Sequence, residues 1–516
     1  MPTFRLLEPR RSTGVPLREL ADVLAPGAVV VSGDGDALSG DADVVIRSVT
    51  LAHREISPGA LFAALPGRRR HGADFADDAA AAGAVAVLTD DAGLASARAS
   101  GLPVLLSPDP RAALGRIAAR VYGTDRDRPQ LLGVTGTNGK TSTVHLLDAV
   151  LRALGVPAGL SSTADRRSRE DVVASRLTSP EAPELHALLA RMREDGVRSA
   201  AIEVSAQALV RARVDGLVFD VAGFTNLSHD HLDDFGDLGS YLRAKQRLFR
   251  PDRSRRGVVV VDTPEGRTVA AEAEVPVVTV GATAEADWRV DVLSLSADAT
   301  RFRLHAPDGW ATTTSVPLIG RHMASNAALA LVMLIEAGHD RDAIGRAVAD
   351  GIDVAVPGRT LLVSGDAGPR LYVDFSHTPD SVARTVDALR EVTPGRVLVI
   401  LGADGDRDPS KRAPMGRAAA ERADLLIVTD HHPRFEDPAR IRRALLDGAR
   451  DGRCEVQEIA EPALAVRAAV GRAGADDSIL WVGPGDTDYR VVLDQDLPYS
   501  PRADAALALA EAGWGV

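Results

Sequence analysis

The chain has 516 residues, of which 45% are apolar and 26% charged, and its formal net charge is −12 at pH 7. This composition is typical of a soluble globular protein, and the length corresponds to roughly three domains. An acidic chain with only 4% aromatic residues offers neither a basic surface nor stacking platforms. We therefore expect no nucleic-acid partner and no membrane-surface partner.

The single cysteine, Cys454, excludes an internal disulfide and fits a reducing, cytoplasmic location. No run of about 20 apolar residues is present, so no membrane-spanning segment is expected. The first residues also lack the apolar core of a cleavable targeting segment.

The N-terminal part alternates short β-like runs with helical stretches, and we expect a small α/β domain over residues 1–126. A helix is predicted over Arg111–Tyr122, ending at Gly123. The polar, proline-terminated stretch T-D-R-D-R-P that follows indicates a linker. The expected strands are Val44–Val49, Ala84–Leu88 and Val104–Leu106.

Residues 127–356 alternate strands and helices, which indicates a parallel sheet. A helix is predicted from the spacing of apolar residues between Val144 and Leu154, with Gly155 as its stop. Alternating polar and apolar residues over Trp288–Leu318 favour an antiparallel section. The expected parallel strands are Gln130–Thr135, Ser199–Val204, Val218–Thr225, Gly257–Asp262 and Pro276–Val280.

The sequence V-P-G-R at residues 356–359 marks a second boundary, and residues 357–516 form a third α/β unit of ordinary domain size. Its expected strands are Leu371–Phe375, Val397–Gly402, Leu425–Thr429, Cys454–Ile459 and Ser478–Val482.

The stretch G-V-T-G-T-N-G-K-T-S-T, residues 133–143, has the character of a phosphate-binding loop between a strand and a helix. The usual spacing G-x-x-x-x-G-K-[ST] is missed, because Val134 stands where the first glycine belongs. Gly136 and Gly139 still allow backbone N–H groups to approach phosphate, Lys140 can reach its oxygens, and Thr141 can ligate Mg²⁺. The alternative is a glycine-rich turn with a surface lysine.

Two further motifs narrow the choice among kinases, ATPases, GTPases and ligases. Glu203, in I-E-V-S, ends a strand and is placed to bind Mg²⁺, although a strand-end carboxylate can also simply face water. The stretch T-N-L-S-H-D-H-L-D, residues 225–233, concentrates metal-competent side chains, although it could be an ordinary loop with helix-capping residues.

These motifs in this order, followed by Y-L-R-A-K at 241–245, resemble the Mur ligase family of cell-wall synthesis. The third unit adds V-D-F-S-H-T-P-D at 373–380, G-D-R-D at 405–408 and K-R-A-P-M at 411–415, which are similar to the MurE type. Members of that type add the third amino acid to UDP-N-acetylmuramoyl-L-alanyl-D-glutamate (UDP-MurNAc-L-Ala-D-Glu). The resemblance covers nearly the whole chain.

The resemblance implies three domains and a reaction. Residues 1–126 would bind the UDP-sugar, residues 127–356 would form a P-loop, ATPase-like ligase domain, and residues 357–516 a Rossmann-like domain for the amino acid. ATP would phosphorylate the D-Glu carboxylate, and the amine of the amino acid would then displace phosphate. The implied partners are the small-molecule substrates alone, and the chain is expected to act as a monomer.

The resemblance also implies roles for individual residues. Lys140, Glu203, His231 and Lys245 would be catalytic, with Lys245 carried as a CO₂-derived carbamate rather than as a surface lysine on a helix. Thr141 and Glu203 would bind one Mg²⁺ and His231 a second, and carbamylated Lys245 would be a further metal ligand. ATP would be bound by Gly136, Thr137, Asn138, Gly139, Lys140, Thr141, Ser142, Asn326, Arg359, Asp374 and His377. The UDP-sugar dipeptide would be bound by His53, Thr178, Ser179, Ser205, Arg211 and Arg213. The amino acid would be bound by Arg407, Asp430, His431, His432, Pro433, Arg434, Gly483 and Thr487.

The chain departs from the family where the amino acid is expected to bind. The diaminopimelate signature D-N-P-R reads H-H-P-R here, so Arg434 remains for a carboxylate while His431 and His432 are new. The family's G-K-G-H-E reads G-P-G-D-T, and Thr487 replaces the Glu that receives the acceptor's distal ammonium. Asp486 or Asp488 could take its place. Further departures are Gln207 for His, Met323 for Asn, and A-H-R at 52–54 for Asp-Ser-Arg.

Diaminopimelate is therefore the expected acceptor, and three alternatives stay open. The chain could be a related ligase that uses a different amine. It could be a nucleotide-binding scaffold without turnover, although the retained Lys140, Thr141 and Lys245 speak against this. A folylpolyglutamate-type ligase would share the phosphate loop but not the motifs of the third unit.

Overall fold

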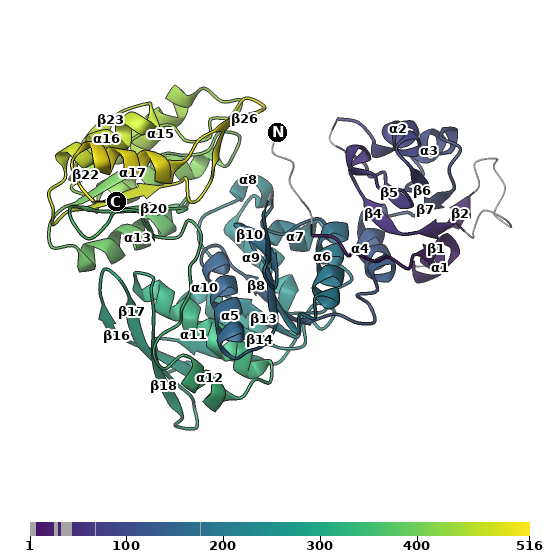
Figure 1. Ribbon diagram of the computed structural model, residues 1–516, viewed down its shortest axis with the longest axis horizontal. Coiled ribbons are helices and arrows are strands. Elements are labelled where there is room, and N and C mark those ends of the chain that lie inside the picture. The colour runs from purple at the N-terminus through teal and green to yellow at the C-terminus, as the bar shows by residue number, and fades with distance from the viewer. Residues whose placement is uncertain (1–6, 25–28, 32–43, 68, 176, 516) are drawn as a thin grey trace.

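The computed structural model describes residues 7–24, 29–31, 44–67, 69–175 and 177–515, and three main sheets follow one another along it (Figure 1). The N-terminal unit lies at one end of the molecule, the C-terminal unit at the other, and the central unit between them. Each main sheet falls within one of the three segments expected from the sequence. The fold class is the α/β, three-domain architecture that was predicted.

The N-terminal unit has a five-stranded sheet in the order β2-β7-β6-β5-β4. The expectation of one strand over Val44–Val49 was wrong, because β3 pairs with β1 while β4 pairs with β5 in the main sheet. The two strands separate at Arg47, whose guanidinium donates to the carbonyl of Ser12 at 3.1 Å. The elements are β1 (Val15–Pro16), α1 (Leu17–Val23), β2 (Val29–Val31), β3 (Val45–Ile46), β4 (Ser48–Thr50), η2 (His53–Glu55), β5 (Ala60–Ala63), η3 (Gly72–Phe75), α2 (Ala76–Ala81), β6 (Ala84–Thr89), α3 (Leu94–Ala99), β7 (Val104–Leu106) and α4 (Pro110–Tyr122).

The central unit has an eleven-stranded sheet in the order β11-β10-β9-β12-β8-β13-β14-β15-β16-β17-β18. It is parallel from β9 to β16 and antiparallel over β16–β18; the sequence predicted both sections, but not the strand β9. The antiparallel strands β10 and β11 at the other edge were not expected.

Two neighbouring residues of β8 show that helices cover both faces of this sheet. Leu131 belongs to the apolar cluster beneath α6, α7 and α9, and Leu132 to the cluster beneath α5 and α11. The strands are β8 (Gln130–Thr135), β9 (Ala158–Ser161), β10 (Asp165–Ser168), β11 (Asp171–Ala174), β12 (Ser199–Glu203), β13 (Val221–Phe224), β14 (Gly257–Val260), β15 (Val277–Gly281), β16 (Trp288–Leu295), β17 (Thr300–His305) and β18 (Ala311–Val316). The helices are α5 (Lys140–Ala153), α6 (Ala182–Glu194), α7 (Ala206–Val210), α8 (Leu232–Phe235), α9 (Leu238–Gln246), η4 (Arg247–Phe249), α10 (Pro264–Glu272), α11 (Arg321–Glu336) and α12 (Arg341–Ala347).

The C-terminal unit has a six-stranded sheet in the order β19-β20-β24-β21-β22-β23, parallel except for β19, and a separate β25-β26 hairpin that was not predicted. Apolar residues of α13, α14 and α15 cover one face and those of α16 and α17 the other. Its elements are β19 (Leu361–Leu362), β20 (Arg370–Asp374), α13 (Pro379–Val392), β21 (Val397–Leu401), η5 (Pro409–Lys411), α14 (Arg412–Ala420), β22 (Leu425–Val428), α15 (Pro438–Ala449), β23 (Glu455–Glu458), α16 (Pro462–Arg472), β24 (Ser478–Val482), β25 (Tyr489–Val492), β26 (Gln495–Pro498) and α17 (Pro501–Glu511).

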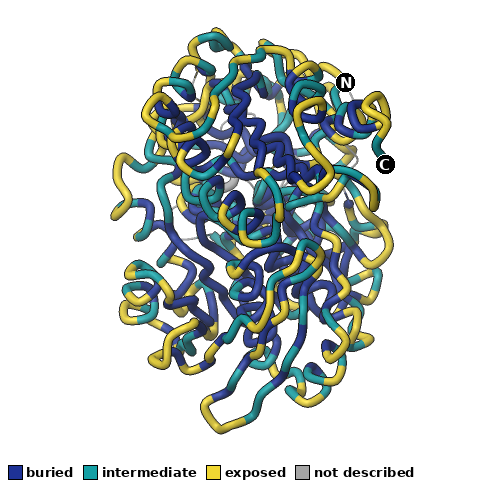
Figure 2. Tube along the Cα trace, turned by 90° about the vertical axis from the view of Figure 1, so that its left-hand side faces the viewer, coloured by how far each residue is buried: buried dark blue, intermediate teal, exposed yellow. Residues whose placement is uncertain are grey.

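Buried residues follow the strands and the inner faces of the helices, and exposed residues lie mainly in the connecting loops (Figure 2). In the part of the chain that the structure covers, no helix has the length and apolar character needed to cross a membrane.

Candidate active site

The loop between β8 and α5 is held in shape by the residues that follow β13. The Thr137 N–H donates to the Asn226 carbonyl at 2.8 Å, and the Thr225 hydroxyl donates to the Asn138 carbonyl at 2.6 Å. Gly136 has φ +148°, and a Cβ there would lie 1.8 Å from the Thr225 Oγ1. The loop thus requires glycine at 136, and it ends at the N-terminus of α5, where backbone N–H groups favour an anion.

The Lys140 ammonium lies within this loop, where it donates to the carbonyls of Gly136 at 3.0 Å and Thr137 at 2.8 Å. Burial lowers its pKa, while the charges of Glu203 and Asp230 act in the opposite direction. The next two residues, in the first turn of α5, are buried: Thr141, whose hydroxyl accepts from the Arg359 guanidinium at 3.1 Å, and Ser142.

Glu203 ends β12 next to β8, and its side chain is fully buried. The backbone N–H and the hydroxyl of Thr163 donate to its two carboxylate oxygens at 2.8 and 3.0 Å. The hydroxyl of Thr178 lies 3.1 Å from that of Thr163. The alternative of a water-facing carboxylate is wrong for Glu203, and Thr163 is a neighbour that no sequence motif indicated.

Two predicted dipeptide-binding residues, Ser179 and Ser205, lie beside Thr178 and Glu203. The Ser179 hydroxyl donates to the Glu203 carbonyl at 2.8 Å and accepts from the Ser205 N–H at 3.0 Å. Arg213 pairs with Glu181 at 2.9 Å and so stays on this side of the sheet. These residues come from separate segments and form one polar group around the end of β12.

Arg211 and His53 lie apart from that group. Arg211 is exposed and pairs with Asp234 at 3.2 Å. His53 lies in the N-terminal unit and stacks on Phe75, with ring centroids 4.4 Å apart. A cleft between the N-terminal and central units begins beside it and is lined by Glu8, Ser48, Thr50, Ala52, Glu55, Tyr122, Arg166 and Glu184.

Asp230, which the sequence analysis did not single out, joins the central and C-terminal units. The Lys411 ammonium donates to its Oδ1 at 3.0 Å, and the Nε2 atom of His377 lies 3.6 Å from its Oδ2. Burial would raise the pKa of Asp230, but the neighbouring His377 and the charge of Lys411 hold it well below the usual range. Asp230 is therefore an anion between two domains.

His231 follows Asp230 in a left-handed conformation, with φ +56°, and its Nε2 lies 3.5 Å from the Asp230 Oδ2. Burial lowers the pKa of His231 to about 4, with Asp230 acting in the opposite direction. The imidazole is accordingly neutral near pH 7, the form that binds metal ions.

Lys245, on α9, is buried with 1% of its surface exposed, so it is not a surface lysine. Its Nζ donates to the Gly136 carbonyl at 2.6 Å and lies 4.2 Å from the centroid of the Tyr241 ring. Burial and the neighbouring Lys140 lower its pKa well below the usual range. Two lysines therefore meet at one turn of the phosphate loop.

The predicted nucleotide residues beyond α5 approach the same loop. Asn326, on α11, lies so close to Gly139 that a Cβ there would be 2.5 Å from its Oδ1. Arg359 reaches Thr141 and places its guanidinium 4.7 Å from the centroid of the Phe375 ring. Asp374 orders the adjoining segment by accepting the N–H groups of Thr360 and Ser376, both at 2.7 Å.

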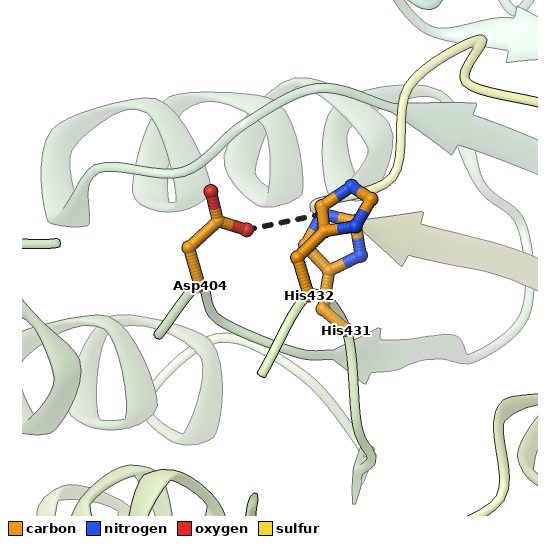
Figure 3. A group of neighbouring side chains, drawn as sticks. All are labelled: Asp404, His431 and His432. Carbon is orange, nitrogen blue, oxygen red and sulfur yellow. Dashed lines mark ion pairs between the residues drawn. The ribbon is translucent and has the colours of Figure 1, made fainter. Parts of the chain in front are cut away.

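Three residues of the predicted acceptor site, His431, His432 and Arg434, lie near Asp404, and Figure 3 shows the two histidines beside it. The Asp404 carboxylate lies 3.4 Å from the His431 Nε2 and 3.4 Å from a guanidinium nitrogen of Arg434. The rings of His431 and His432 have centroids 3.9 Å apart. Among the described residues, Asp404, His431 and His432 are the one group of three His, Cys, Asp or Glu side chains whose ligand atoms all lie within 4.8 Å.

The remaining predicted acceptor residues have other partners or lie at the surface. Asp430 pairs with Arg442 at 2.5 Å, and the Thr487 hydroxyl donates to the Pro484 carbonyl at 3.0 Å. The Gly483 N–H donates to the Asp374 carbonyl at 2.9 Å, the Pro433 carbonyl accepts from the Glu436 N–H at 3.0 Å, and Arg407 is exposed.

Comparison with known proteins assigns this arrangement to a family. Residues 45–122 match the model of the Mur ligase family catalytic domain, residues 134–334 the Mur ligase middle domain, and residues 358–485 the Mur ligase glutamate ligase domain. A UDP-N-acetylmuramyl-tripeptide synthetase of Leifsonia xyli subsp. xyli is 54% identical over 505 residues, 96% of this chain and 98% of that protein. The chain belongs to the Mur ligase family.

Two further comparisons extend across this Mur ligase. A UDP-N-acetylmuramoyl-L-alanyl-D-glutamate--2,6-diaminopimelate ligase of Streptomyces coelicolor is 42% identical over 505 residues, 96% of each chain. A solved structure of a UDP-N-acetylmuramoyl-L-alanyl-D-glutamate--2,6-diaminopimelate ligase aligns with a TM-score of 0.66 and 24% identity, over 97% of this chain and 100% of that one, and it supports the fold. The chain is an ATP-dependent ligase of the Mur family, as its sequence motifs predicted.

Proposed function

We propose that this Mur ligase adds the third amino acid to UDP-MurNAc-L-Ala-D-Glu during synthesis of the peptidoglycan precursor. The observation that carries the proposal is the 54% identity, over nearly all of both chains, to a UDP-N-acetylmuramyl-tripeptide synthetase. The phosphate loop, with Lys140 inside it and the N-terminus of α5 behind it, supports the use of ATP.

In the proposed reaction, the γ-phosphoryl group passes from ATP to the side-chain carboxylate of D-Glu, giving ADP and an acyl phosphate. The amine of the incoming amino acid attacks the acyl carbon, an amide forms, the amine loses a proton, and inorganic phosphate leaves. Lys140 and the loop N–H groups would stabilise the phosphate charge, and Thr178, Ser179 and Ser205 would hold the D-Glu end beside Glu203.

We further propose that Thr141 and Glu203 bind one Mg²⁺ and His231 a second, with a carbamate on Lys245 as a further metal ligand. The donor set fits this role, because Glu203 is a buried carboxylate and His231 is a neutral imidazole. Lys140 interacts electrostatically with both residues, which supports their grouping around one phosphate site. Mg²⁺ would supply positive charge to the phosphate oxygens when bound.

The surroundings of Lys245 fit carbamylation. CO₂ reacts with a neutral amine, and the lowered pKa of Lys245 provides that form. The carbamate would place an anion beside the Lys140 ammonium, and the two opposite charges would attract each other. Residues 1–126, 127–356 and 357–516 would carry the UDP-sugar, ATP and the amino acid, in a cytoplasmic monomer.

Diaminopimelate is the proposed acceptor, because Arg434 can bind the carboxylate that diaminopimelate carries on its distal carbon. A second candidate, ligation of a different amine, is favoured by Thr487, whose neutral hydroxyl is bonded to its own loop.

The test is phosphate release by the purified protein with ATP, Mg²⁺ and UDP-MurNAc-L-Ala-D-Glu. The amines compared are meso- and LL-diaminopimelate, L-lysine, L-ornithine and neutral amino acids. Release confined to a diaminopimelate, with the tripeptide product found by mass, supports the first candidate. Release with another amine supports the second, and silence with every amine refutes the proposed function.

A further inference from the structure

Asp404 is an acidic side chain at the acceptor site for which the sequence motifs give no role. It lies shortly after β21, and Arg434 shortly after the neighbouring parallel strand β22. Because adjacent parallel strands end at the same edge of a sheet, this pairing brings Asp404 and Arg434 together, 3.4 Å apart. The Asp404 side chain remains 29% exposed and that of Arg434 26%, so both are open to a ligand.

His377 links Asp404 to residues that approach the phosphate loop. His377 interacts electrostatically with Asp404 and also lies 3.6 Å from Asp230. Asp230 in turn acts on Lys140 and Lys245 at the phosphate loop. A molecule bound at Asp404 therefore lies on the side of the C-terminal unit where an acyl phosphate would be attacked.

A metal ion is a poor occupant for the group formed by Asp404, His431 and His432. The Nδ1 atom of His432 accepts the Val491 N–H at 2.9 Å, so the neutral ring carries its proton on Nε2. Neither nitrogen of His432 then has a free lone pair for a metal. The guanidinium groups of Arg434 and Arg490 also act on His432 and would repel a divalent cation.

Asp404 nevertheless carries a negative charge, as the binding of an organic cation requires. Burial would raise its pKa, but His431, His432 and Arg434 together hold it below the usual range. The other acidic candidates are less suitable. Asp486 and Asp430 pair with Arg502 and Arg442 instead of with Arg434, and Asp488 is exposed.

We propose, on the basis of the function proposed above, that Asp404 receives an ammonium group of the acceptor while Arg434 receives the carboxylate on the same carbon. An amino-acid end has its two charges on one carbon, so a receptor for it needs an anion and a cation side by side, as Asp404 and Arg434 are. The acceptor class is then a diamino acid whose unreacted amine lies beside a carboxylate. Asp404 takes over the charge that Thr487 lacks.

The experiment compares Asp404→Asn with the wild type, using the amine that the wild type accepts and an analogue with hydrogen in place of the unreacted ammonium. We expect the wild type to prefer the diamino acid by about 10- to 100-fold in kcat/KM, the range that loss of one charged hydrogen bond produces. In Asp404→Asn this preference should collapse towards one through a raised acceptor KM, while the KM for ATP stays unchanged.

Asp486→Asn is the matched control and should keep the wild-type preference, and Asp404→Glu should retain part of it. Asp404→Ser provides a second neutral variant if Asp404→Asn is insoluble. An unchanged preference in the neutral variants overturns the inference. The inference is also overturned if the wild type binds stoichiometric zinc, and Asp404→Asn loses this zinc but keeps the amine preference. If the wild type releases no phosphate with any amine, the proposed function itself is refuted. This result differs from turnover with an unchanged preference, which refutes only the inference about Asp404.

Discussion

Replacing Gly136 with alanine should weaken nucleotide binding while leaving the rest of the fold intact. The new Cβ would lie 1.8 Å from the Thr225 Oγ1 and 3.1 Å from the Asn226 backbone nitrogen, so Thr225 must move. Moving it breaks its 2.6 Å hydrogen bond to the Asn138 carbonyl, which contributes about 1 kcal/mol. The positive φ adds about 2 kcal/mol of backbone strain for any residue other than glycine.

A cost of about 3 kcal/mol corresponds to a loss on the order of 100-fold in ATP affinity, if the strained loop must regain its shape to bind phosphate. Titration with a fluorescent ATP analogue measures this loss. Gly155→Ala is the control, because Gly155 has φ +71° but no atom within 4 Å of an added Cβ, which isolates the backbone strain. The combination Gly136→Ala, Thr225→Ala should recover part of the affinity. Wild-type affinity in Gly136→Ala would refute the argument that the loop and Thr225 fit against each other.

Three further outcomes are expected. Lys245→Ala should lose about 10²- to 10³-fold in phosphate release, with partial recovery in added short carboxylates, and full activity would eliminate the carbamate. Lys411→Met should destabilise the contact between central and C-terminal units by about 3 kcal/mol, because Asp230 loses its cation; unchanged denaturant unfolding and unchanged small-angle scattering would contradict this. The folded-state pKa of Asp230 is depressed, so its contribution is present above the unfolded pKa of about 4 and disappears as pH falls through the folded value. Wild type and Asp230→Asn should therefore differ in stability at pH 7 and converge in strong acid, and a constant difference across the titration would be evidence against a depressed pKa.

Local patterns predicted much of the fold. The period of apolar residues after the phosphate loop indicated α5, and Gly155, with φ +71°, follows its end as expected. The long buried strands of the central sheet were found because each is an apolar run between helices. The separation of β3 from β4 at Arg47 was missed, because β3 pairs with β1, which is far from it along the chain. The β25-β26 hairpin was missed because its strands are only weakly apolar.

The residues of the candidate site also divide into those that local motifs indicated and those that only the fold brings together. Lys140, Glu203 and Lys245 stand in motifs of fixed spacing, so their proximity to the loop could be expected before the structure was known. The pair formed by Asp230 and Lys411 spans 181 residues, and Lys411 was part of a quoted motif without a role. Nothing in the sequence around Asp404 says that it meets Arg434, because that contact depends on the order of strands in the sheet.

The side-chain amide of Asn138 is shared between two domains. It donates to Ser228 within the central unit at 3.1 Å, and to Thr378 at 3.3 Å and Asp380 at 3.1 Å in the C-terminal unit. The peptide that would face phosphate is therefore also a point of domain attachment. If attachment of the C-terminal unit increases the affinity for nucleotide by some factor, thermodynamic linkage requires that bound nucleotide strengthens this attachment by the same factor. Release of nucleotide from the loop and separation of the C-terminal unit would then be two parts of one coupled equilibrium.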